Sequence, residues 1–102
     1  MDSVEAKIVR VAEAMIEGKM QLIQGCRDLC GFLSLTLEPE RDVFLAIIAI
    51  ESETDHFPLG DVRRECAPDY LKRMDGEMDR YIEDARVDIL CACHELIQIF
   101  RR

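Results

Sequence analysis

A helical repeat of apolar side chains runs through the last third of the chain. Pro68 suits a first helical turn, and the apolar side chains that follow recur every three or four positions: Tyr70, Met74, Met78, Tyr81, Ala85, Ile89, Cys93, Leu96 and Phe100. Because that spacing lines one side of an α-helix, it predicts one helix of roughly 45–50 Å, with its apolar C-terminal half in the core. A helix this long in a chain of 102 residues favours a small helical bundle.

Two shorter amphipathic helices are predicted in the first third of the chain. Apolar residues at steps of three and four indicate one over residues 3–17, where Asp2 and Glu5 have the spacing of a capping box. The same periodicity indicates a second over residues 20–33. Gly25 lies inside this second helix and predicts a close crossing with another helix.

The most apolar stretch, Val43–Ile50, fits either a helix or a buried strand. We favour a helix, with Pro39 in its first turn, because no other segment could pair with a strand. Its side chains are apolar on all sides, which predicts burial on every side. The predicted fold is therefore all-α, with three shorter helices packed on a long C-terminal helix, and residues 1–102 form one domain.

The charge of the chain limits its partners. The sequence holds 21 acidic residues against 13 lysines and arginines, a formal net charge of −8. Such a surface repels nucleic-acid phosphates and anionic membranes, so neither is an expected partner. It suits a basic protein, or it serves solubility alone.

The cysteines predict a reducing compartment. Their number is odd and they form no paired framework, which indicates free thiols in the cytoplasm: Cys26, Cys30, Cys66, Cys91 and Cys93. The longest apolar run has eight residues, against the roughly 20 that a membrane helix needs. No basic segment opens the chain as in a signal peptide.

Four of these cysteines also raise the question of a zinc site. Cys91, Cys93 and His94 lie close in sequence, and Cys26 and Cys30 could supply further ligands. Cysteine is nevertheless a small and readily buried residue, and most of this set falls on predicted core positions. Core packing is the favoured interpretation, so we predict no metal and no cofactor.

The segment that follows the apolar stretch is the first candidate site. Residues 51–64 hold several acids, a histidine and two arginines before and after a break at Pro58. Asp55 would lie near a helix C-terminus, where the dipole disfavours a carboxylate, so Arg63 or Arg64 is expected to compensate. Three interpretations stay open: a network that pins the turn, a binding site, or catalysis.

The catalytic interpretation is a metal-dependent or acid–base enzyme that uses Glu51, Asp55 and His56. The spacing of these residues matches neither the H-E-x-x-H motif nor an EF-hand loop. We therefore expect a protein that is not an enzyme and keep this reading as the alternative.

The second candidate site is a set of acids along the long helix. Asp75, Asp79 and Glu83 step by four, with Asp84 and Asp88 beside them. These acids form either a solvated face or a docking stripe for a basic protein. In the second case, aromatic and flexible side chains nearby would be suitable contacts: Tyr70, Met74, Met78 and Tyr81.

The segment from Ser52 to Arg63 reads S-E-T-D-H-F-P-L-G-D-V-R. It resembles the pattern S-E-T-D-x-x-P-x-G-x-x-R of a set of small bacterial single-domain proteins. Residues 67–71 and the segments around Gly18 and Gly25 are similar to that set as well, although only the central motif is specific. The resemblance implies a bacterial source and a recurring compact domain, but no mechanism.

The leading functional prediction is a small acidic protein-binding module in the cytoplasm. Small acidic bacterial proteins are often immunity proteins or antitoxins, which suggests an inhibitor that covers the basic active site of a toxin. A structural homodimer is a further alternative. The predicted binding residues are Glu51, Glu53, Asp55, His56, Asp61, Arg63, Asp75, Asp79 and Glu83.

Overall fold

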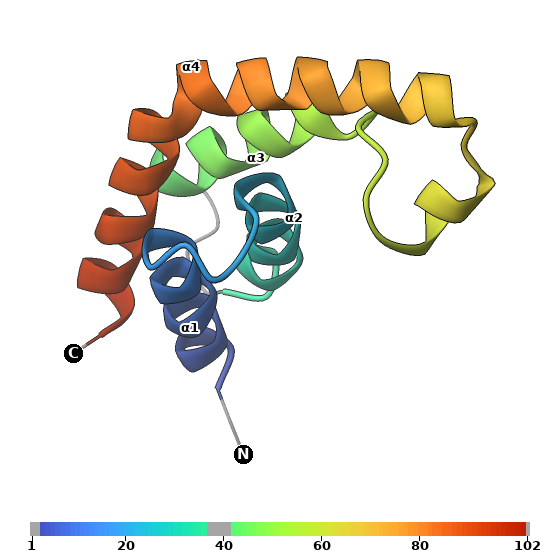
Figure 1. Ribbon diagram of the computed structural model, residues 1–102. Helices are drawn as coiled ribbons and strands as arrows, with labels where there is room; N and C mark the ends of the chain where they lie inside the picture. Colours follow the sequence, from blue (N-terminus) through green and yellow to red (C-terminus); the bar gives the residue numbers. More distant parts are fainter. Residues whose placement is uncertain (1–2, 37–41, 102) are drawn as a thin grey trace.

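Helices make up most of the chain that the computed structural model describes, residues 3–36 and 42–101. The elements are α1 (Val4–Ile16), α2 (Leu22–Leu33), α3 (Asp42–Thr54), a short 3-10 helix η1 (Gly60–Glu65) and α4 (Pro68–Phe100). Figure 1 shows α4 running above α3 and then turning, so that its red C-terminal part descends beside α1. The predicted all-α architecture of three shorter helices packed on a long C-terminal helix is confirmed.

The first helix begins one residue later than predicted. The hydroxyl of Ser3 accepts a hydrogen bond from the backbone N–H of Ala6 at 3.1 Å, which makes Ser3 the N-cap. The predicted capping box of Asp2 and Glu5 is therefore wrong, and Asp2 itself lies outside the described residues. Gly18 follows the helix with a φ of 74°, a left-handed conformation that glycine adopts without strain.

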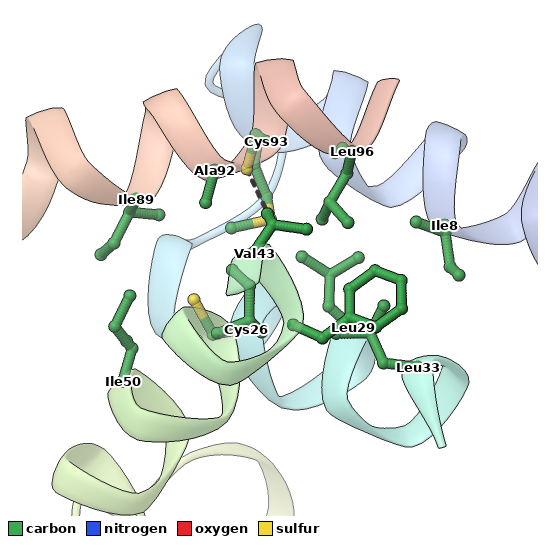
Figure 2. Packing of buried hydrophobic residues seen from close by; sticks show 14 of the residues in the cluster. Ile8, Cys26, Leu29, Leu33, Val43, Ile50, Ile89, Ala92, Cys93 and Leu96 are labelled. Carbon is green, nitrogen blue, oxygen red and sulfur yellow. Dashed lines mark hydrogen bonds between the residues drawn. The ribbon is translucent and has the colours of Figure 1, made fainter. Parts of the chain in front are cut away.

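The main core lies where the C-terminal half of α4 meets the other three helices, as predicted. In Figure 2, Ile89, Ala92, Cys93 and Leu96 of α4 face side chains from α1, α2 and α3. The rings of Phe44 and Phe100 stack with their centroids 5.9 Å apart at its edge. The main core contains residues from α1, α2, α3 and α4: Ile8, Ala12, Met15, Leu22, Cys26, Leu29, Leu33, Val43, Phe44, Ile47, Ile50, Ile89, Ala92, Cys93 and Leu96.

The close crossing predicted at Gly25 is confirmed. A Cβ atom placed on this glycine would lie 2.6 Å from Cγ and 2.8 Å from Cε of Met15. Met15 belongs to α1 and is only 2% exposed, so its side chain fills the space that any larger residue at position 25 would need.

A second, smaller core lies under the N-terminal half of α4. Met74 and Met78 are buried there against Ile23 of α2 and Phe57, which follows α3. The side-chain amide of Gln21 also donates a hydrogen bond to the sulfur of Met78 at 3.3 Å. The prediction that the two methionines contact a partner is therefore wrong, because Phe57 turns back beneath α4 and covers them.

The apolar segment Val43–Ile50 is a helix, not a strand, but it is not buried on every side. The neighbouring helices cover one face of α3, while Leu45 and Ile48 on the other face are 54% and 44% exposed. The predicted start at Pro39 lies outside the described residues.

Candidate functional site

An arginine of α2 holds the turn that follows α3. One terminal nitrogen of Arg27 donates hydrogen bonds to the backbone carbonyls of Thr54 and Phe57, both at 2.7 Å. The hydroxyl of Thr54, which is fully buried, donates to the carbonyl of Ile50 at 2.8 Å. Arg27 thus supplies the positive charge that the C-terminal end of α3 favours. The expectation that Arg63 or Arg64 would do so is wrong.

Arg63 instead joins η1 to α4. Its guanidinium donates to both carboxylate oxygens of Asp75 at 2.8 Å and to the carbonyl of Pro58 at 3.0 Å. The hydrogen bonds from Arg63 lower the pKa of the Asp75 carboxyl, and the same contact raises the pKa of Arg63. Two residues predicted to bind a partner are therefore paired with each other.

This pair predicts a pH-dependent contribution to stability. Asp75→Asn should destabilise the protein at pH 7, because it removes the charge that Arg63 contacts. A lowered pKa in the folded state means that the wild-type advantage is full above the unfolded pKa of about 3.9 and disappears as the pH falls through the folded pKa. Urea midpoints of both proteins at pH 7 and at successively lower pH test this. A difference between the two urea midpoints that stays constant down to the lowest pH at which both proteins fold would contradict the prediction.

The predicted cluster of Glu51, Asp55 and His56 does not form a metal centre in the structure. His56 is exposed, and its ring lies tilted against that of Phe57 with the centroids 4.2 Å apart. Within residues 3–36 and 42–101, no group of three or more His, Cys, Asp or Glu side chains is arranged to hold a metal ion. The described contacts of His56 include no hydrogen bond to either carboxylate that would orient it as a base.

An open groove between α3 and α4 is the strongest candidate site. It has a volume of about 640 Å³. Its apolar lining comes from both helices: Val43, Ala46, Ile50, Ala85 and Ala92. Four exposed carboxylates line it as well: Glu53, Asp84, Asp88 and Glu95. No lysine or arginine of the described chain lines it, so the groove is apolar inside and negative at its rim.

A hydrogen bond joins the two walls of this groove. The hydroxyl of Tyr81 on α4 donates to Oε2 of Glu53 on α3 at 2.6 Å. Partial burial and the neighbouring carboxylate both raise the pKa of Tyr81, so the phenol keeps its proton and stays a donor. The contact fixes the spacing of α3 and α4 at this point.

The groove acids on α4 are the two that were expected beside the predicted stripe, Asp84 and Asp88, together with Glu95. Asp84, Asp88 and Glu95 are separated by four and seven positions, so they follow one face of α4. The predicted stripe begins at Asp75, which pairs with Arg63, and lies on another face. Of the nine predicted binding residues, only Glu53 lines the groove.

Comparison with known proteins gives no relative for this chain. No family model matches it, and no curated protein or solved structure matches it either. None of the described helices is long and apolar enough to cross a membrane. The resemblance of residues 52–63 to small bacterial proteins stays a prediction.

The cysteines differ in burial, and Cys30 and Cys66 are half-buried. Cys26 and Cys93 are fully buried, and burial raises the pKa of Cys26 to about 12 and that of Cys93 to about 11. The thiol of Cys93 packs 3.7 Å from the sulfur of Met15. Cys91, by contrast, is exposed and lines the groove. Core packing accounts for the buried pair, and Cys91 offers a chemical reporter for occupancy of the groove.

Proposed function

We propose that this protein is a non-enzymatic binding module for a basic protein. The observation that carries the proposal is the groove between α3 and α4, which combines an apolar lining with four carboxylates. An apolar lining gains free energy when a partner covers it, and carboxylates at a rim select a basic partner and accelerate its association. The net charge of −8 adds long-range attraction for such a partner.

The apolar surface extends beyond the groove along α3. Leu45 and Ile48 are exposed next to Ala46, which lines the groove itself. Exposed apolar side chains that adjoin a groove indicate an interaction surface more strongly than isolated ones do. This outer face of α3 also supports the second candidate function, a homodimer, in which it would be covered by a second copy of the chain.

The most concrete form of the proposal is an immunity-like inhibitor that acts in the cytoplasm. Basic active sites, such as those that bind nucleic acid, are covered effectively by an acidic surface. The small size and acidity of the chain and the resemblance of residues 52–63 support this form by analogy.

A comparison of two charge reversals tests the proposal. The groove variant is Asp84→Lys with Asp88→Lys, and the second variant is Asp79→Lys with Glu83→Lys, which changes the net charge equally on another face of α4. Tagged wild type and both variants are used to capture partners from a lysate of the source organism at low salt and at ~0.5 M salt. We expect a basic protein that wild type and the second variant retain at low salt, and that the groove variant loses.

Other outcomes contradict the proposal in distinguishable ways. Loss of the partner in the second variant alone would place the interaction on the stripe predicted from the sequence. Equal capture by all three proteins would show that the groove acids contribute nothing. Light scattering of the purified protein tests the homodimer. If the protein is a dimer that Leu45→Glu converts to a monomer, the exposed face of α3 binds a second copy of the chain.

A further inference from the structure

We infer that the occupant of the groove is a single amphipathic helix of the partner, with cationic side chains along one flank only. This inference rests on the proposed function and specifies the partner surface that the groove accepts. It follows from three properties of the groove: its walls, its small residues and the uneven distribution of its charge.

The walls of the groove favour a helix over an extended peptide. Both walls are helices, so they present side chains and no free strand edge to which an extended segment could add its backbone hydrogen bonds. A helix satisfies its own backbone groups and can therefore lie against an apolar lining without leaving them unpaired. The α4 wall runs from Tyr81 to Glu95, about 20 Å, which matches roughly four turns of a docked helix.

Small residues allow that helix to come close. Ala46 on α3 and Ala85 and Ala92 on α4 all line the groove. Interaxial distances between packed helices fall to about 8 Å where the side chains at the contact are small. Large side chains of the partner can then pack against the exposed Ala46 and over the edges of Val43 and Ile50, which belong to the main core.

The distribution of charge gives the docked helix an orientation. The α4 wall carries Asp84, Asp88 and Glu95, all exposed. The α3 wall carries Glu53, which already accepts a hydrogen bond from Tyr81, and is otherwise apolar. A complementary helix therefore places lysines or arginines beside α4, at steps of three and four, and apolar residues toward α3.

Two synthetic peptides of about 18 residues, made only of leucine, alanine and lysine, test this inference. In the first, the lysines occupy positions i, i+4, i+7 and i+11 beside a leucine stripe. The second has the same composition, with the lysines spread around the helix. Affinity is measured by calorimetry, and occupancy of the groove by the rate at which iodoacetamide alkylates Cys91. Cys66 in the η1 region, outside the groove, is the internal reference.

We expect the first peptide to bind at least about tenfold more tightly than the second and to slow alkylation of Cys91 but not of Cys66. Asp84→Lys with Asp88→Lys should abolish the difference. Equal affinities, or binding that leaves Cys91 unprotected, would overturn the inference. If partner capture depends on Asp84 and Asp88 but the first peptide does not bind, the proposed function stands and the helical occupant is wrong. If the variant with both acids reversed captures the partner as well as wild type does, the proposed function itself fails.

Discussion

Gly25→Leu is expected to destabilise the protein by about 3 kcal/mol or more, since it overfills a packed helix crossing. A Cβ atom at this position would already lie 2.6 Å from Cγ of Met15, and a leucine adds three further carbon atoms. Met15 cannot move aside easily, because it is 2% exposed and packs against Cys93. Leucine is a better helix former than glycine by about 1 kcal/mol, so the expected loss is steric. Urea unfolding followed by circular dichroism measures it.

A matched control lies on the same helix. Gly31 is exposed, and a Cβ atom there would meet nothing within 4 Å. Gly31→Leu should therefore leave stability unchanged or raise it by up to about 1 kcal/mol. Adding Met15→Ala to Gly25→Leu should recover part of the loss, because it frees the space that leucine needs. Equal effects at positions 25 and 31 would show that the crossing does not depend on the absence of a side chain.

The architecture was predictable because the apolar residues of α1, α2 and α4 recur at helical spacing. The burial of α3 was not, since all eight residues from Val43 to Ile50 are apolar and no polar residue marks the exposed face. Only the packing of α2 and α4 decides that Val43 and Ile47 are covered while Leu45 and Ile48 are not. The spacing of apolar residues shows which face of a helix is buried only where polar residues alternate with them.

The sequence indicated that acids of α4 could form a candidate site, but not which of them line the groove. Acids of α4 were expected to form a docking stripe, yet the groove selects Asp84 and Asp88 because α3 packs beside them. The signal available in the sequence was the continuation of their spacing to Glu95. The role of Arg27 was missed for a different reason. Its partners, Thr54 and Phe57, lie 27 and 30 positions away in the sequence, and spacing within residues 51–64 gives no information about such distant contacts.

Arg27→Met is expected to lower the free energy of unfolding by about 3 kcal/mol. The guanidinium donates to the carbonyls of Thr54 and Phe57 at 2.7 Å, and a hydrogen bond from a charged donor contributes about 1.5–3 kcal/mol. Methionine keeps the packing of the side chain but supplies no donor. Because Phe57 covers Met74 and Met78, loosening this turn also loosens the smaller core. Thermal unfolding by calorimetry should show a Tm lower by more than about 10 °C.

His56→Ala separates this structural role from a surface role within the same motif. The histidine is exposed and its ring packs against that of Phe57, so we expect its loss to change stability by less than about 0.5 kcal/mol. Arg27→Lys should fall between the two variants, because an ammonium group keeps the charge but not the planar fork. A large loss for His56→Ala with little effect of Arg27→Met would reverse the assignment and make the histidine the residue that holds the turn after α3. The expected order would instead show that residues 54–57 depend on α2 for their conformation.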